Sequence, residues 1–139
     1  MDISLTRIND AICFEAKNEN GASIQLDGAP EMGGVNGGLR PMEGLLAALA
    51  SCSAFEVVSI LKKQKQQLEK LRIKVSGKRT TNKTVQPFSE IRIHFDLTGE
   101  VDHTKAAKAV ALSLGSYCSV RASLHPDIEI THSIEIKPT

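Results

Sequence analysis

The 139-residue chain has no tryptophan, one tyrosine and only three cysteines, and its formal net charge is +1. A small, odd number of cysteines without an N-terminal export signal excludes a secreted scaffold held by disulfide bonds, and it predicts a reducing cytoplasm in which any disulfide is transient. Charges of both signs are interspersed, so the basic surface of a nucleic-acid-binding protein and a polybasic membrane anchor are both missing. We expect no segment that spans a bilayer, no nucleic-acid partner and no membrane partner.

The motifs of several enzyme classes are missing as well. His94, His103 and His125 have no metal-ligand spacing to any cysteine, and His132 stands in an apolar strand row that is typical of a core histidine. The glycine-rich segment 28–38 lacks the Lys-Ser/Thr ending of a phosphate-binding loop, so we interpret it as a flexible lead-in to a helix that could act as a flap over a pocket. There is no Ser-His-Asp signature. We therefore expect neither a metal nor a cofactor.

Hydrophobic residues make up 41% of the chain, which is enough for a core, and the length fits a single domain over residues 1–139. Pro41 suits the first turn of a helix, where its missing N–H would have no partner, and no proline interrupts the sequence from there to about Glu69. Before this helix, short apolar runs separated by Asn-rich turns predict three strands, at 3–8, 13–16 and 22–26.

The long helix is apolar nearly all round from Leu45 to Leu61, which predicts a position at the centre of the fold or between subunits. A hairpin should follow it. Residues 71–75 and 91–95 alternate between apolar and polar side chains, as half-buried strands do, and the polar segment 78–87 connects them.

A second helix, capped by Asp102 or Thr104, is expected to run to about Ser119. Isoleucines recur on one face of a final strand over 128–136. The whole order is three strands, a long helix, a hairpin, a second helix and a last strand. It predicts an α+β fold rather than a wound parallel sheet.

Two of the three cysteines lie in apolar, small-residue segments that look alike: Cys52 within ALASCSA (48–54) and Cys118 within GSYCSV (115–120). Both segments predict helix. Two thiols on separate helices can meet in a fold, where such a pair can form a reversible disulfide. This requires their Cα atoms to approach within about 4.4 to 6.8 Å. Cys13 lies in a strand run, and we interpret it as packing.

A purely structural role for the two thiols stays open, because free cysteine often acts as a small buried hydrophobe. Reactivity needs a thiolate and hence a nearby positive charge, which the helix dipole does not supply at Cys52, well past Pro41. Glu56 lies four residues after Cys52 on the same helical face. It either organises a pocket together with an arginine, for which Arg121 is one candidate, or it pairs with a neighbouring helix or strand.

A family resemblance runs through essentially the whole chain. Residues 40–52 (RPMEGLLAALASC) and 56–61 (EVVSIL) resemble the central helix of the osmotically inducible protein family (OsmC/Ohr), especially its YhfA-like branch. Residues 117–120 (YCSV) and 130–133 (ITHS) resemble the second cysteine helix and the closing strand of that branch. The resemblance implies an intertwined homodimer in which the long cysteine helices pack centrally between sheets, with two sites at the subunit interface.

In the peroxidase members of that family, one cysteine attacks an organic hydroperoxide and the other resolves the product. The resemblance implies by position that Cys52 is the attacking thiol and Cys118 the resolving thiol, after which a dithiol reductant restores both. Those members also use an arginine from the N-terminal strands, paired with a glutamate at the start of the cysteine helix. The arginines upstream of Cys52 in this chain are Arg7 and Arg40.

The glutamate is displaced from the family position. Ten residues before Cys52 the chain has Met42, and Glu43 follows it. At 3.6 residues per turn, Glu43 and Cys52 project from opposite faces of their own helix. Glu43 therefore serves either a site across the dimer or the N-terminus of its own helix, where a negative charge is favourable.

Two functions from different classes follow. The first is a thiol-dependent peroxidase that reduces organic hydroperoxides through Cys52 and Cys118, with Glu56, Glu43 and Arg40 as further candidate site residues. The second is a non-catalytic module that binds a small apolar ligand at the dimer interface, with its cysteines only packed.

Overall fold

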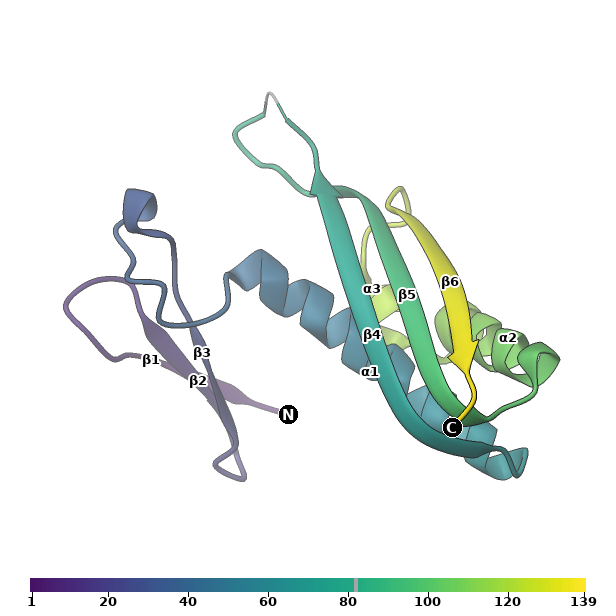
Figure 1. The fold of residues 1–139 in the computed structure, drawn as a ribbon. Helices are drawn as coiled ribbons and strands as arrows, with labels where there is room; N and C mark the ends of the chain where they lie inside the picture. The colour runs from purple at the N-terminus through teal and green to yellow at the C-terminus, as the bar shows by residue number, and fades with distance from the viewer. Residues whose placement is uncertain (82) are drawn as a thin grey trace. The chain divides into compact units, whose positions relative to one another are not determined.

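A computed structural model describes residues 1–81 and 83–139 of the chain, which divide into two compact units, 1–45 and 46–139. We describe each unit by itself. The observed order confirms the α+β fold, while the expectation of one domain stays a prediction. The elements are β1 (Ile3–Arg7), β2 (Phe14–Asn18), β3 (Ser23–Leu26), the short 3-10 helix η1 (Pro30–Met32), α1 (Pro41–Lys63), β4 (Gln67–Arg79), β5 (Phe88–Glu100), α2 (His103–Leu112), the π-helical turn η2 (Ser113–Tyr117), α3 (Ser119–Ser123) and β6 (Glu129–Lys137) (Figure 1).

The N-terminal unit contains an antiparallel sheet in the order β1-β2-β3. Asn18 builds the turn between β2 and β3, because its side-chain oxygen accepts hydrogen bonds from the main-chain N–H groups of Asn20 at 3.0 Å and Ala22 at 2.9 Å. Gly21 in this turn has φ +86°, a conformation that glycine adopts without steric cost. The three strands expected from the sequence are confirmed to within two residues at each end.

The loop between β3 and α1 is organised around the buried side chain of Asp27. Its carboxylate accepts hydrogen bonds from the main-chain N–H groups of Gly28 at 2.7 Å, Val35 at 3.2 Å and Gly37 at 2.9 Å. A side chain at Gly34 would collide with the carbonyl of Gly28, so the loop also needs a glycine there. This is an ordered loop with its own hydrogen-bond centre, not the flexible lead-in expected from its glycines.

Helix α1 begins at Pro41, as expected, but it ends at Lys63 rather than near Glu69. Lys65 adopts φ +58°, the left-handed conformation that commonly ends helices. Strand β4 then begins at Gln67. The residues after the helix have good helix propensity, so the end of α1 is decided by the pairing of β4 with β5 rather than by local sequence.

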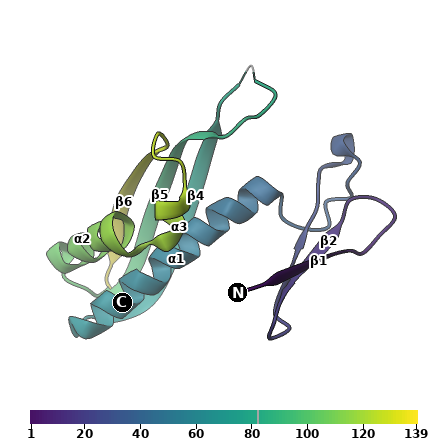
Figure 2. The ribbon, with the colours of Figure 1, turned by 180° about the vertical axis from the view of Figure 1, so that it is seen from behind.

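The C-terminal unit has a second sheet in the order β4-β5-β6, in which β4 and β5 are antiparallel and β5 and β6 are parallel. The expected hairpin and last strand are therefore confirmed, with longer strands. Asn82 in the polar connection 78–87 lies outside the described residues. Within this unit, α1, α2 and α3 all lie on the same side of the sheet, as opposite views show (Figures 1 and 2).

The second helix is interrupted before the residue where we expected it to end. Asp102 caps α2 as predicted, because its carboxylate accepts a hydrogen bond from the main-chain N–H of Lys105 at 2.9 Å. The α-helix ends at Leu112, and the π-helical turn η2 follows it. Cys118 is consequently not inside a helix but in extended conformation, with φ −80° and ψ +102°, just before α3.

The core of the C-terminal unit lies between the sheet and the helices. Helix α1 contributes one face to this core, with buried residues at four-residue spacing. The opposite face of α1 is exposed in the single chain, and Phe55 on that face is 75% exposed. The all-round burial expected for α1 is therefore absent in the single chain. The most deeply buried apolar residues are Leu49, Val57 and Leu61 of α1, Ile91, Ile93, Phe95 and Leu97 of β5, and Ala106, Ala109 and Val110 of α2.

Helix α1 also has the length and the mean hydropathy, 1.9 in its most apolar window, of a membrane-spanning helix, although no such segment was expected from the sequence. This property concerns length and composition only. The core helix of a soluble protein has it too, and one face of α1 belongs to such a core.

Candidate functional site

The structure brings Cys52 and Cys118 together. Cys52 is half-buried on α1, Cys118 is 4% exposed, and both are free thiols. Cys52 lies close enough to Cys118 to raise the pKa of that thiol, so the two cysteines are neighbours in the fold.

The backbone between α2 and α3 places Cys118 at this point. The π-helical turn η2 closes when the main-chain N–H of Cys118 donates to the carbonyl of Ser113 at 2.8 Å. The hydroxyl of Ser113 in turn donates to the main-chain carbonyl of Ser53 at 2.9 Å, and Ser53 is the residue after Cys52. One hydrogen bond therefore joins the two cysteine segments. Such π-helical turns occur frequently at functional sites.

The surroundings of Cys118 favour its neutral thiol. Burial raises the pKa of Cys118 above the ordinary value of 9.0, and the neighbouring Cys52 raises it further. The main-chain N–H of Arg121, which donates to the Cys118 sulfur at 3.4 Å, acts in the opposite direction. Because burial is the largest of these effects, Cys118 holds its proton at neutral pH.

A cavity of about 240 Å³ lies against Cys118. Arg121 and His125 contribute its basic side chains, and Ile128 and Ile130 contribute part of its apolar wall. The Arg121 guanidinium is held by a hydrogen bond from Nη1 to the carbonyl of Leu114 at 2.8 Å. Cys118 and Arg121 both line this cavity, whereas Cys52 is not among its lining residues.

Glu56 and Arg121, two candidates from the sequence, do not form an ion pair. Glu56 is half-buried on α1, and among the described residues no Lys, Arg or His nitrogen lies within 4.0 Å of its carboxylate. The side chain of Arg121 binds the Leu114 carbonyl instead. No direct contact between Glu56 and Arg121 therefore supports the alternative in which Glu56 organises a pocket together with this arginine.

The remaining candidates belong to the N-terminal unit, and each has a local contact there. The main-chain N–H of Arg40 donates to Glu43 at 2.8 Å, a capping-box bond at the start of α1. The Arg40 guanidinium donates to the side-chain oxygen of Asn36 at 2.6 Å. Arg7 donates to the carbonyls of Ala11 at 2.6 Å and Asp10 at 2.5 Å, and so holds the turn between β1 and β2.

Sequence analysis missed a buried thiol and carboxylate in the N-terminal unit. Cys13 is 4% exposed and Asp27 is 3% exposed, and the Asp27 carboxylate lies close enough to the Cys13 thiol to raise its pKa. Burial and this carboxylate raise the pKa of Cys13. The hydrogen bond from Gly37, supported by those from Gly28 and Val35, lowers the pKa of Asp27. The available signal was an aspartate directly before a glycine-rich loop, a common place for a carboxylate that binds main-chain N–H groups.

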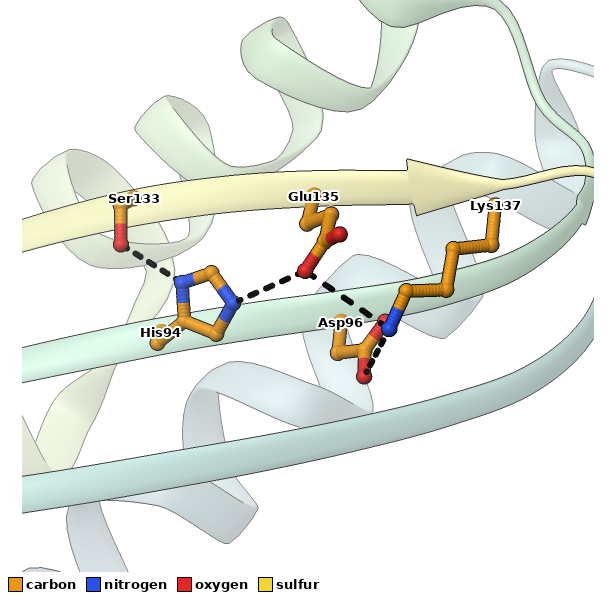
Figure 3. Close-up of polar contacts among 5 residues, drawn as sticks. All are labelled: His94, Asp96, Ser133, Glu135 and Lys137. Carbon is orange, nitrogen blue, oxygen red and sulfur yellow. Dashed lines mark hydrogen bonds and ion pairs between the residues drawn. The ribbon is translucent and has the colours of Figure 1, made fainter.

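The outer face of the second sheet carries a polar cluster of five residues from β5 and β6 (Figure 3). His94 Nδ1 is 2.7 Å from the Ser133 hydroxyl, but His94 Nε2 is 3.8 Å from Glu135, beyond hydrogen-bond distance. Lys137 joins Glu135 at 3.7 Å to Asp96 at 3.3 Å. The His94 side chain is 41% exposed, so this Ser-His-Glu grouping is a surface ladder across two parallel strands and not an oriented catalytic base.

His132, on the other face of β6, is exposed. The interpretation of it as a core histidine is therefore wrong. It lies in the same row as Ile130 and Ile134, which are only half-buried themselves, so this row stands at the margin of the core.

A larger apolar groove of about 820 Å³ lies on the exposed side of α1, between α1 and β4. Its wall from β4 consists of Leu71, Ile73 and Val75. The wall from α1 consists of Ala47, Ala50, Ser51, Ala54, Phe55 and Val58. An uncovered apolar surface of this kind is typical of an interaction or ligand-binding site.

Comparison with known proteins relates this chain to one family. The family model described as "OsmC-like protein" matches residues 34–133. Protein YhfA of Escherichia coli strain K12 is 34% identical over 131 residues, which cover 91% of this chain and 92% of that protein. Two solved structures share the fold. A hypothetical protein from Aquifex aeolicus VF5 has a TM-score of 0.80 at 32% identity, covering 98% of this chain and 96% of that one. An organic hydroperoxide resistance protein OsmC from Legionella pneumophila has a TM-score of 0.67 at 17% identity, covering 94% and 99%.

Proposed function

The chain belongs to the OsmC-like protein family, and on this premise we propose that it is a cytoplasmic stress protein that reduces organic hydroperoxides through Cys52 and Cys118. The observation that carries the proposal is that the two free thiols are close enough for Cys52 to raise the pKa of Cys118. The name of the Legionella protein, which shares this fold, makes hydroperoxides a reasonable substrate class.

The reaction has two steps. The Cys52 thiolate attacks the distal oxygen of the hydroperoxide, the O–O bond breaks, and the alcohol leaves with a proton while Cys52 becomes a sulfenic acid. The Cys118 thiol then attacks the sulfenic sulfur, which forms the disulfide and releases water. A dithiol reductant later exchanges with this disulfide, so that both cysteines regain their protons and the reductant becomes a cyclic disulfide.

We assign the attacking role to Cys52 because the environment of Cys118 opposes a thiolate there. The nucleophile in peroxide reduction is the thiolate, and burial keeps Cys118 protonated at neutral pH. A neutral thiol next to the site of attack is suited to the second step. Glu56, one helical turn after Cys52, is the nearest candidate on that helix to take up or supply a proton.

We also propose that the protein is a homodimer in which a second copy covers the apolar groove between α1 and β4. The groove has a predominantly hydrophobic wall, and Phe55 at its rim is 75% exposed in the single chain. Leaving such a surface in water is unfavourable, at roughly 25 cal/mol for each Å² of apolar area. An identical subunit is the partner that the family membership suggests.

The decisive experiment is a thiol count after oxidation. Reduced protein mixed with one equivalent of cumene hydroperoxide should lose two of its three thiols rapidly, and mass spectrometry should find a Cys52–Cys118 bond. Cys52→Ser should abolish this loss. Cys13→Ser is the matched control, because it removes the third thiol, which lies in the other unit, and should still lose two. Thiols that stay unchanged after long exposure would rule out the peroxidase.

The alternative is a non-catalytic module that binds a small apolar ligand. The observation in its favour is the apolar groove itself, whose described lining contains no charged side chain. It predicts saturable binding of an apolar fluorescent probe that Phe55→Glu abolishes, together with cysteines that do not react with hydroperoxide. The peroxidase predicts the opposite result for the cysteines.

A further inference from the structure

The chain contains two Asn-Gly pairs, Asn20-Gly21 and Asn36-Gly37, and both asparagines are exposed. In such a pair the main-chain nitrogen of the glycine can attack the side-chain amide carbon of the asparagine, because glycine has no side chain that hinders the ring which forms. Asparagine is a thermolabile residue. Exposure is alike at the two sites, so the contacts of the two glycines distinguish them.

The nitrogen of Gly37 is held by a buried carboxylate. Its N–H donates to Asp27 at 2.9 Å, and a methyl group added to Gly37 would lie 3.1 Å from the same Asp27 oxygen and 3.3 Å from the Cys13 sulfur. A hydrogen bond to a charged acceptor is stronger than one to a neutral acceptor, and it must break before this nitrogen can react. The nitrogen must also lose its proton, and a neighbouring carboxylate opposes the negative charge that results.

The nitrogen of Gly21 is held more weakly. Its N–H donates to the neutral main-chain carbonyl of Asn18 at 3.1 Å, in the exposed turn between β2 and β3. Water can replace a neutral hydrogen bond at an exposed position at little cost. A methyl group added to Gly21 would have no described heavy atom within 4 Å, so the space around this glycine is open to the movement that ring closure needs.

We propose that Asn20 is a site of spontaneous deamidation in the native protein and that the hydrogen bond from Gly37 to Asp27 protects Asn36 from the same reaction. The Gly21 nitrogen loses its proton and forms a bond to the side-chain amide carbon of Asn20. The C–N bond of the side-chain amide breaks, and ammonia leaves with that proton. Water then opens the cyclic imide at either carbonyl, which gives aspartate or isoaspartate. No electrons are transferred, and neither cysteine of the proposed function takes part.

The modification changes the turn in which it occurs. Both products add a negative charge, and isoaspartate also adds one carbon atom to the main chain. The turn is built on the side-chain oxygen of Asn18, which accepts hydrogen bonds from the main-chain N–H groups of Asn20 at 3.0 Å and Ala22 at 2.9 Å. A longer main chain between these two donors cannot keep both bonds in the same geometry, so amide exchange of Ala22 should be faster in the isoaspartate form.

The test measures both asparagines in one sample. Native protein is kept in mildly alkaline buffer and is then digested at mildly acidic pH by a protease that cleaves after glutamate. Cuts after Glu19, Glu31 and Glu43 place Asn20 and Asn36 in different peptides, and mass spectrometry measures deamidation in each. Each rate is divided by the rate of the same asparagine in urea-unfolded protein, which removes the effect of local sequence. The fold should slow Asn36 about tenfold more than Asn20, as expected when a hydrogen bond to a charged group must break first.

Two variants identify the contact that protects Asn36. Asp27→Ala removes the acceptor of the Gly37 N–H, so Asn36 should then be slowed no more than Asn20. Arg40→Gln is the matched control, because it removes the other side-chain contact of Asn36, at 2.6 Å, and should leave Asn36 slow. If Asp27→Ala does not fold, which amide exchange of the first sheet detects, the wild-type comparison decides alone. Equal slowing of the two asparagines in the wild type, or an Asn36 that stays slow in folded Asp27→Ala, overturns the proposal.

Discussion

Ser113 donates its side-chain hydroxyl to the main-chain carbonyl of Ser53 across 2.9 Å, and both residues are fully buried. This contact connects residues sixty positions apart in the chain. Ser53 follows Cys52, and Ser113 begins the π-helical turn that closes on Cys118. The bond therefore joins the two cysteine segments directly.

Removing the hydroxyl should lower stability and also loosen the thiol pair. Ser113→Ala loses one buried hydrogen bond, so we expect the free energy of unfolding to fall by about 1 kcal/mol. The rate of disulfide formation after oxidation should fall as well, measured by quenched-flow thiol counting. Ser123→Ala is the control, because its hydroxyl donates to the Ser119 carbonyl within its own exposed helical turn. An unchanged oxidation rate in Ser113→Ala would show that the bond does not position the cysteines.

The Asp27 carboxylate should make the N-terminal unit sensitive to acid. Hydrogen bonds from Gly37 and its neighbours lower the pKa of Asp27 below 3.8, so the folded state holds the proton less tightly than the unfolded state. Its contribution to stability is therefore present above pH 3.8 and is lost as the pH falls through the lowered value. The measurement is amide exchange of Gly37, which donates to this carboxylate at 2.9 Å.

Asp27→Asn should reduce the protection of the Gly37 amide from exchange at neutral pH. The difference in this protection between the variant and the wild type should shrink below pH 3.8. Asp10→Asn, an exposed carboxylate in the same unit, is the control and should leave the exchange profile unchanged. If the protection of the wild-type Gly37 amide from exchange stayed constant well below pH 3.8, this result would contradict the role given to Asp27.

The sequence predicted most of the C-terminal unit, because alternation in β5 and the proline at the start of α1 are strong local signals. The predicted ends of α1 and of the second helix were wrong, because tertiary contacts decide where these two helices end. The residues from Gln66 to Lys70 have good helix propensity, yet strand pairing with β5 begins at Gln67. The π-helical turn over Ser113–Tyr117 before Cys118 was not predicted; it closes through the main-chain bond from Cys118 to Ser113, and the Ser113 hydroxyl also bonds to α1.

The candidate site was predictable only in part. The similar surroundings of Cys52 and Cys118 identified the pair, since small apolar residues allow close packing of their segments. The contact partner of Arg121 could not be predicted, because its guanidinium binds the main-chain carbonyl of Leu114, and residue spacing does not encode such main-chain geometry. Glu43 bonds at the N-terminus of its own helix, which is one of the two alternatives that the sequence left open.

The exposed groove on α1 leads to a prediction about assembly. Phe55→Glu places a charge in the apolar surface that the second copy is proposed to cover, and we expect the dimer to dissociate to monomers, measured by light scattering after size-exclusion chromatography. Val85→Glu is the matched control: Val85 is equally exposed, at 75%, but lies in the connection between β4 and β5 rather than in the groove. Dimers that persist in Phe55→Glu would place the subunit interface elsewhere.

The protonation of Cys118 can be measured directly through its alkylation rate. Burial and the neighbouring Cys52 raise the pKa of Cys118, so the folded protein should show a midpoint for iodoacetamide labelling of this residue above pH 9.0. Cys52→Ser removes the effect of the neighbouring thiol, and the midpoint should move down. Cys13→Ser should leave it unchanged. A wild-type midpoint at or below 9.0 would remove the reason for assigning the resolving role to Cys118.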